Sequence, residues 1–309
     1  MLKELLESKK CFKLVCGAGN EDAQEVEKLV TLYSYAGCKF FDLSAKPEIV
    51  DAAKKALQGR EGYLCVSVGI KGDPHIQKAQ IDYTRCIECH KCEEICPQKT
   101  ISYCKINSKR CIGCGKCFSV CNHDAISFVS EDKDLGEILP PLINKGIDCI
   151  ELHTTNENNV LEKWDYINSV YKGILSVCIS RGDLSDSKMI ELIKQMITKR
   201  PDYTTIVQAD GFPMSGENDD YKTTLQAIAT AEIVQNAKMP SYIMLSGGTN
   251  SKTAELAKMC GINYNGIAIG TYARNIVRKY IERDDFLTNK YIFEEALNIA
   301  KNLVNKLNS

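Results

Sequence analysis

Short apolar runs bounded by turn residues recur along the chain and alternate with segments of helical spacing. The runs that read as buried strands are Cys11–Cys16, Cys38–Asp42, Tyr63–Ser67, Asp148–His153, Leu175–Ile179, Thr205–Gln208, Tyr242–Leu245 and Gly266–Ile269. Between them, the spacing predicts helices over Glu21–Tyr35, Lys46–Leu57, Asp186–Thr198, Tyr221–Ala237 and Ser251–Met259. Nearly continuous apolar strands that alternate with helices indicate a parallel sheet buried on both faces.

Eight βα units in a row favour closure, so the sequence predicts an α/β protein with a (β/α)8 barrel. We expect the barrel to contain residues 1–74 and 131–309, and a separate module to be inserted after the third strand, at residues 75–130. Without that module, the 309 residues leave about the usual 250 of this fold. Loops after strands lie on the C-terminal face, so the module should sit over the barrel mouth. A doubly wound open sheet is the alternative.

Charge and hydropathy narrow the possible partners and compartment. Lys and Arg total 39 and Asp and Glu total 40, a net charge of -1, which argues against nucleic acid. No stretch approaches the roughly 18 consecutive apolar residues of a membrane span, and the charged first ten residues lack the apolar core of a signal peptide. We expect a cytoplasmic protein. Sixteen cysteines in a reducing compartment indicate metal binding more than disulfides.

Half of these cysteines form two runs in the inserted module, each with the spacing C-x2-C-x2-C-x3-C. The two runs are Cys86-Ile-Glu-Cys89-His-Lys-Cys92-Glu-Glu-Ile-Cys96 and Cys111-Ile-Gly-Cys114-Gly-Lys-Cys117-Phe-Ser-Val-Cys121. This is the spacing of bacterial two-cluster ferredoxins, in which the fourth Cys of each run ligates the other cluster. The sequence therefore predicts two [4Fe-4S] clusters. Their ligands should be Cys86, Cys89, Cys92 and Cys121 for cluster one, and Cys111, Cys114, Cys117 and Cys96 for cluster two.

Zinc is the alternative metal, but it takes four ligands in two pairs, and two repeats of four fit it poorly. His90 and His123 lie beside cluster ligands. We expect them to tune the surroundings of the clusters and not to bind iron, because every cluster corner already has a Cys.

Glycine-rich turns follow the last two strands and predict a phosphate site. In many barrels these two loops present backbone N–H groups to a phosphate. The predicted binding residues are Ser246, Gly247, Gly248, Thr249, Gly270 and Thr271. FMN is the first ligand considered, and a phosphorylated metabolite is the second. The alternative is that the glycines only make tight turns, and that Asn250 or Ser251 only caps a helix.

Polar residues at other strand ends predict chemistry at the same mouth. Glu151 and His153 stand two apart on one strand and therefore point to the same side, where they could transfer protons. Lys71 and Arg181 complete the predicted catalytic group. Alternatively, Glu151 only forms an ion pair with Lys46, Lys71 or Arg181.

Three features of the chain resemble the LdpA family, the light-dependent period iron-sulfur proteins. They are the opening Phe12-Lys-Leu-Val-Cys-Gly-Ala-Gly, the double cysteine motif after the third strand, and Leu245-Ser-Gly-Gly-Thr-Asn-Ser-Lys-Thr-Ala-Glu-Leu-Ala. In photosynthetic members that family is regarded as a redox sensor that reports electron transport to the circadian clock. The resemblance implies [4Fe-4S] clusters and protein partners, and it names no catalytic residues in this chain.

Two functions follow from these patterns. In the first, the protein is an electron carrier or redox sensor with a redox protein as its partner. In the second, it is an oxidoreductase whose clusters pass electrons to a flavin or a phosphorylated ligand in the barrel. The polar mouth favours the enzyme, and the resemblance favours the sensor.

Overall fold

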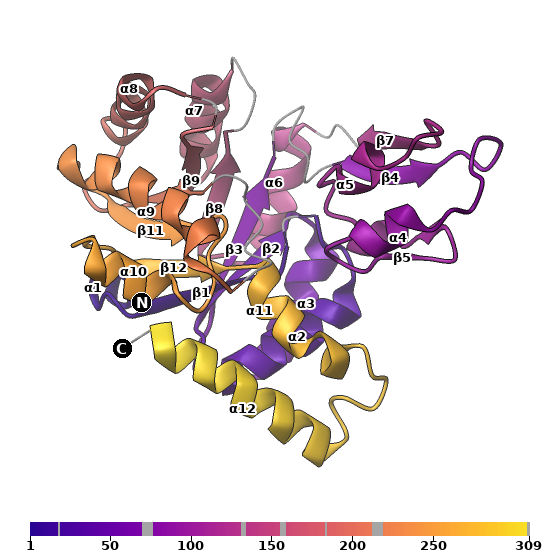
Figure 1. Ribbon diagram of the computed structural model, residues 1–309. Helices are drawn as coiled ribbons and strands as arrows, with labels where there is room; N and C mark the ends of the chain where they lie inside the picture. Colours follow the sequence, from indigo (N-terminus) through magenta and orange to yellow (C-terminus); the bar gives the residue numbers. More distant parts are fainter. Residues whose placement is uncertain are drawn as a thin grey trace.

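The computed structural model of the protein describes residues 1–17, 19–69, 77–130, 134–154, 159–182, 184–211 and 219–307. Its central feature is a closed barrel of parallel strands in the order β1-β12-β11-β10-β9-β8-β3-β2 (Figure 1). The barrel strands are β1 (Cys11–Val15), β2 (Phe40–Ser44), β3 (Tyr63–Val68), β8 (Cys149–His153), β9 (Ile174–Ser180), β10 (Thr205–Asp210), β11 (Tyr242–Ser246) and β12 (Gly266–Ile269). The predicted barrel is confirmed, and the open sheet is wrong.

Helices surround the barrel and connect successive strands on its outside (Figure 1). They are α2 (Ala23–Tyr35), α3 (Pro47–Leu57), α6 (Leu135–Asn144), α7 (Val160–Val170), α8 (Asp186–Ile197), α9 (Tyr221–Asn236), α10 (Thr253–Met259), α11 (Thr271–Ile281) and α12 (Lys290–Leu307). The predicted helices begin and end within two residues of these bounds. α10 begins at Thr253 and not at Ser251, because Asn250 to Lys252 form the turn that precedes it.

Packing follows from two apolar surfaces on each strand. The outward side chains form one large core with the helices, which includes Leu14 and Trp164. The inward side chains form a second core in the lower part of the barrel, which includes Cys11, Phe40 and Met244. The cysteines of the barrel strands are buried and pack as small hydrophobic side chains. Cys38, with which the second strand was predicted to begin, is also buried but lies two residues before β2.

A short helix that the sequence did not predict, α1 (Leu2–Glu7), closes the bottom of the barrel. Leu6 is fully buried in the inward core, and its carbonyl accepts a hydrogen bond from Asn265 Nδ2 at 3.1 Å. The barrel interior is thus apolar and covered at the N-terminal ends of the strands. Its polar groups lie towards the opposite face, where the active sites of such barrels form.

Residues 77–130 follow β3 in the chain and form a separate small unit outside the barrel. Its elements are β4 (Gln77–Ile81), α4 (Lys91–Ile95), β5 (Ile101–Ser102), β6 (Lys105–Ile106), the 3₁₀ helix η2 (Ser108–Arg110), α5 (Lys116–Ser119) and β7 (Ile126–Ser130). β4 pairs antiparallel with β7, so the two ends of the segment lie side by side. The predicted domain boundaries, between residues 74 and 75 and between residues 130 and 131, fall within or beside stretches that lie outside the described residues, and they stay a prediction.

This segment contacts the rim of the barrel at the loop after β1, at α2 and at α11. Lys78 Nζ lies 3.5 Å from Glu21, and the Glu21 amide donates to the Lys109 carbonyl at 2.6 Å. Arg278 of α11 donates to the Gln98 carbonyl at 2.9 Å. Figure 1 accordingly shows the segment to one side of the barrel. It was expected over the mouth, but its contacts in the described part of the chain are with the rim next to β1.

Candidate functional site

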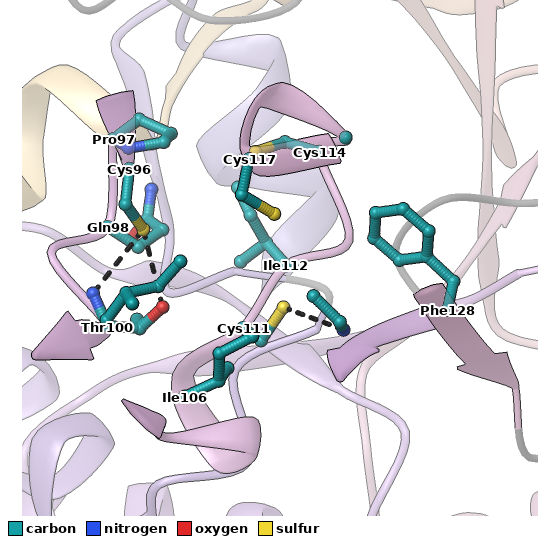
Figure 2. Close-up of a pocket in the computed structure, with 13 residues that line it drawn as sticks. Cys96, Pro97, Gln98, Thr100, Ile106, Cys111, Ile112, Cys114, Cys117 and Phe128 are labelled. Atoms are coloured by element: carbon teal, nitrogen blue, oxygen red, sulfur yellow. Dashed lines mark hydrogen bonds between the residues drawn. The ribbon is translucent and has the colours of Figure 1, made fainter. Parts of the chain in front are cut away.

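The thiols of four cysteines surround a pocket in the segment, on the side that contacts the barrel. Cys96, Cys111, Cys114 and Cys117 line this pocket, whose empty volume is about 340 Å³ including the solvent at its opening. The rest of its lining is largely apolar and includes Ala79, Pro97, Ile101, Ile106, Ile112 and Phe128. Figure 2 shows Cys96, Cys111 and Cys117 around the common space. We call this the inner pocket.

A second pocket lies further along the same segment and has the same chemistry. Cys86, Cys89, Cys92 and Cys121 line it, together with Cys104, His90 and His123. Its empty volume is about 370 Å³ including the solvent at its opening, and we call it the outer pocket. In both pockets three cysteines come from one run and the fourth comes from the other run. The predicted ligand sets have the same composition.

The backbone repeats around the two pockets. Glu88 and Gly113, which precede the second Cys of each run, both have a positive φ, at 55° and 63°. His90 and Gly115, which follow that Cys, also have positive φ values of 60° and 77°. A residue with a positive φ at each position bends the chain around the pocket. This conformation is less costly in free energy for glycine than for a residue with a Cβ atom.

Hydrogen bonds and charges in the pockets suit a bound cationic cluster. Backbone amides donate to cysteine sulfurs, from Ala79 to Cys111 at 3.4 Å and from Thr100 to Cys96 at 3.4 Å (Figure 2). Burial raises the pKa of Cys117 to about 12, and the neighbouring thiols of Cys114, Cys111 and Cys96 add to this. Four thiolates so close together need iron to balance their charge. The residues present therefore fit an iron-sulfur cluster.

Both histidines beside the cluster ligands lie on the surface of the segment. His90 is half exposed, and its Nδ1 atom lies 3.0 Å from Glu93 Oε1. His123 is also exposed. Cys104 is buried beside the outer pocket, with its sulfur 4.0 Å from His90 Nδ1, and burial raises its pKa to about 11.

Inside the barrel, a buried lysine forms the centre of a polar network that the sequence did not reveal. Lys13 is fully buried on β1, and its Nζ atom lies 2.5 Å from Glu151 Oε2 and 3.7 Å from Asp42 Oδ1. It also donates to Gln208 Oε1 at 3.2 Å. β1 and β8 are not neighbours in the barrel, so the Lys13–Glu151 pair crosses its interior.

Electrostatics in this network keep Lys13 and Glu151 charged. Burial acts to lower the pKa of Lys13, but Asp42, Cys65 and Glu151 hold it well above its usual value. Burial acts to raise the pKa of Glu151, but Lys13 and a hydrogen bond from His153 hold it well below its usual range. The pKa of Asp42 is raised, because burial outweighs Lys13. Lys13 and Glu151 therefore form an ion pair, and Asp42 takes up a proton more readily than Glu151 does.

Further polar side chains at the ends of β8, β9 and β10 extend the network towards the mouth. His153 Nε2 lies 3.5 Å from Glu151 Oε1, and the Cys178 thiol donates to the same oxygen at 3.2 Å. Asp210 follows on β10 and exposes 6% of its surface. Burial, reinforced by Glu151, raises the pKa of Asp210 to about 7.

Only part of the predicted catalytic group comes together. Glu151 and His153 are adjacent, as expected from their spacing. Arg181 Nε lies 3.1 Å from Asp186 Oδ1, and both side chains are exposed at the start of α8. Lys71 lies outside the described residues. Lys46 pairs with Glu21 at 2.7 Å, so the partner of Glu151 is Lys13 and not Lys46 or Arg181. The sequence signal that could have revealed this ion pair is a lysine in the middle of an apolar strand.

The predicted phosphate loops lie at the mouth, and several of their polar groups already have partners. The Ser251 amide and hydroxyl donate to the Asp219 carboxylate at 3.1 and 2.9 Å, and Thr249 Oγ1 donates to the Ala268 carbonyl at 2.5 Å. Gly247 has φ +62° and packs against Gly211, where a Cβ atom would lie 2.6 Å from the Gly211 nitrogen. An incoming phosphate near Ser251 would meet the Asp219 carboxylate.

The remaining predicted phosphate residues lie around the same face. Ser246 ends β11, and Gly248 is buried with φ +77°. Gly270 precedes α11 and Thr271 begins it. Gly270 packs near Val15 and Arg274, and Arg274 donates to the Val15 carbonyl at 2.6 Å. Phosphate binding by these residues stays a prediction.

Comparison with known proteins gives consistent results at the level of sequence and fold. The family model described as the light dependent period A C-terminal domain matches residues 142–306, and the LdpA Fe-S cluster-binding domain matches residues 83–132. Light dependent period A from Synechococcus elongatus is 29% identical over 297 residues, covering 90% of this chain and 84% of that protein. No helix in the described ranges is long and apolar enough to cross a membrane.

Solved structures share the barrel at low sequence identity. A truncated 3-deoxy-D-arabino-heptulosonate 7-phosphate synthase from Thermotoga maritima has a TM-score of 0.50 at 10% identity, covering 96% of this chain and 84% of that chain. The YdjI aldolase from Escherichia coli K12 has a TM-score of 0.50 at 7% identity, covering 99% of this chain and 94% of that chain. At these identities the similarity shows the fold alone.

Proposed function

The chain belongs to the light dependent period A family and carries an iron-sulfur-binding domain, and from this premise we propose that it transfers or senses electrons through two [4Fe-4S] clusters. The observation that supports this proposal is the pair of pockets, each of which is lined by four cysteines of the two runs. Cluster one takes Cys86, Cys89, Cys92 and Cys121. Cluster two takes Cys111, Cys114, Cys117 and Cys96. Residues 75–130 are thus a ferredoxin module inserted into the barrel.

Each cluster supplies one-electron chemistry, and the protein sets where the electron enters and what it affects. The inner pocket adjoins the barrel, because Lys78 donates to the Cys111 carbonyl at 2.8 Å and also pairs with Glu21 of the rim. Cations beside cluster two stabilise its reduced, more negative state. A change of charge there acts directly on the contacts between segment and barrel, which is the arrangement that a sensor requires.

The outer pocket is the end that we assign to a redox partner. Cys89 is exposed, Ile87 lines the pocket, and further large apolar side chains are exposed on the same segment. Tyr83, Ile87 and Tyr103 expose 63%, 61% and 84% of their surfaces. Aromatic and aliphatic side chains are enriched in protein interfaces, so this end suits a protein partner. Sixteen cysteines, eight of them with iron-sulfur spacing, suit a reducing compartment, and we place the protein in the cytoplasm.

Metal and sulfide analysis of anaerobically purified protein tests the proposal. We expect about eight iron and eight sulfide per chain, with potentials of a few hundred negative millivolts. A fully loaded sample with about four iron, or with zinc in place of the iron, would contradict the two clusters.

Replacing Tyr103 by Ser should slow reduction by a protein donor without lowering iron content, and Tyr203→Ser, a half-exposed tyrosine on the barrel, is the matched control.

The second candidate is a ferredoxin-linked oxidoreductase that acts on a flavin or a phosphorylated substrate in the barrel. The buried Glu151 and His153 at the end of β8 favour it, because they could move a proton at the mouth. Lys71 and Arg181 would assist them, and FMN phosphate would lie against the loops at 246–249 and 270–271. Acid extraction of purified protein decides this, since a flavin released in proportion to protein supports the enzyme.

A further inference from the structure

Four side chains with metal-binding atoms meet where β8, β9 and β10 end inside the barrel, apart from the cysteine segment. Glu151 and His153 come from β8, Cys178 from β9 and Asp210 from β10. Ligand atoms of the first three all lie within 4.8 Å of one another. The two closest approaches are 3.2 Å from Cys178 Sγ to Glu151 Oε1 and 3.5 Å from His153 Nε2 to the same oxygen. These separations are those of ligands that share one ion.

Asp210 supplies an independent observation that points to a cation. Asp210 exposes only 6% of its surface, and its Oδ1 atom accepts no hydrogen bond in the part of the chain that the structure describes. Buried polar atoms almost always have a partner, and a carboxylate oxygen can only accept. The Asp210 carboxyl faces the same group: Ser246 and Cys178 form hydrogen bonds to it, and His153 and Glu151 interact with it electrostatically.

The network also positions Glu151 for binding. Its Oε2 atom accepts hydrogen bonds from Lys13 at 2.5 Å and from Ser176 at 2.9 Å. Oε1 is thereby turned towards Cys178 and His153, and it also accepts hydrogen bonds from Gln208 Nε2 at 3.1 Å and from Ser67 Oγ at 3.3 Å. Hydrogen bonds of this kind orient metal ligands in known metal sites.

Buried carboxyl groups outnumber buried ammonium groups in the described part of the barrel interior. Three buried carboxyl groups, those of Asp42, Glu151 and Asp210, lie around one buried ammonium, that of Lys13. A second cluster of possible ligands, Asp42, Cys65 and Glu151, shares Glu151. Lys13 already lies beside its two carboxylates, so the place for an added cation is at Asp210.

We propose that Glu151, His153, Cys178 and Asp210 bind one divalent transition-metal ion, and that Zn²⁺ fits this donor set best. Thiolate, imidazole and carboxylate are the zinc ligands of proteins, and four protein ligands complete a tetrahedral site. On binding, the Cys178 thiol loses its proton to solvent and its sulfur takes up the metal bond. This site is separate from the clusters and does not depend on their number.

Zinc binding by the full-length protein with its iron in place tests this proposal. Protein is titrated anaerobically with Zn²⁺ against a competing chelating dye, and zinc, iron and sulfide are then measured per chain. We expect about one zinc per chain with iron and sulfide unchanged. Zinc K-edge absorption should show one sulfur neighbour at about 2.3 Å and the remainder nitrogen or oxygen. Four sulfur neighbours would mean that zinc had entered a cluster pocket, and would overturn the proposal.

Matched variants separate binding from folding. Asp210→Asn keeps the shape and removes the unpaired charge, so it should fold normally and bind zinc at least about tenfold more weakly. Cys178→Ala should do the same, while the controls Asp148→Asn and Cys38→Ala keep wild-type affinity. Zinc should raise the thermal midpoint of the wild type and leave that of Asp210→Asn unchanged. No zinc uptake by the wild type, or equal affinity in wild type and Asp210→Asn, would refute the site.

Discussion

At the scale of single residues, Lys13 shows how one side chain can determine the interior of a barrel. It is the one buried ammonium beside Asp42 and Glu151 among the described residues, and it reaches Glu151 across the barrel. Its ammonium group also lies 5.3 Å from the ring centre of Phe40. The apolar lower core and the polar upper network meet at this residue.

Lys13→Met should destabilise the protein strongly, because it leaves two carboxylates buried without a cation. Removing one partner of a buried ion pair costs about 3–5 kcal/mol in free energy of unfolding. The double variant Lys13→Met with Glu151→Gln should recover part of this loss. Anaerobic urea unfolding measures it, and Lys39→Met is the control, since its pair with Glu61 is half exposed and should contribute little to stability. Equal effects of the two lysine changes would show that the buried pair is not ionic.

Asp219 provides a test of the predicted phosphate site at the mouth. Its carboxylate accepts from the amide and hydroxyl of Ser251, where a phosphate would bind. If the loops bind phosphate, Asp219→Asn should strengthen the binding of FMN several-fold by removing a like charge. Isothermal titration measures the affinity, and Asp220→Asn, at the neighbouring helix cap, is the control. If neither protein binds FMN or inorganic phosphate, the glycines only shape the turns.

At the scale of elements, the cysteine runs are coupled by their fourth members. Cys96 lies in the inner pocket with Cys111, Cys114 and Cys117, although it belongs to the run that starts at Cys86. Likewise, Cys121 ends the second run but lies in the outer pocket, which the first three cysteines of the other run line. α4 and α5, which follow the second Cys of each run, pack against each other between the two pockets.

Cys96→Ala should therefore damage cluster two and leave cluster one largely intact, while Cys121→Ala should do the reverse. The physical reason is that each change removes one of four ligands from one pocket only. Low-temperature electron paramagnetic resonance of the two reduced variants distinguishes the clusters. Loss confined to the cluster of Cys86, Cys89 and Cys92 in Cys96→Ala would contradict the crossed assignment.

Much of this architecture could be predicted from the sequence, for specific reasons. Strands such as Tyr63–Val68 are buried on both faces, so they read as apolar runs with turn residues at each end. The cysteine spacing is regular enough to predict both ligand sets from the order of residues alone. Lys13 was missed because its partners, Glu151 and Asp42, come from other strands, and only barrel closure brings them together. α1 was missed because six residues are too few for a clear helical period.

At the scale of the whole molecule, the barrel and the inserted segment differ in what holds them together. The barrel has one core between strands and helices and another inside the strands. The segment has a small core of Ala79, Cys96, Ile101, Cys111, Cys117 and Ile126, half of which are cysteines of the inner pocket. Its regular strands are short, and its stability must come largely from bound metal.

Removal of iron by a chelator should consequently unfold residues 77–130 while the barrel stays folded. Metal-binding free energy is folding free energy when the site forms only on folding, and the segment has little apolar burial to replace it. Hydrogen exchange with mass spectrometry should then show loss of protection in β4 and β7 and continued protection in barrel strands such as β2 and β10. The rim contacts of Glu21 and Arg278 should weaken at the same time, because their partners Lys78 and Gln98 belong to the segment. If the barrel strands lost protection at the same chelator concentration, the two parts would form one cooperative unit, and the clusters would then support the whole fold.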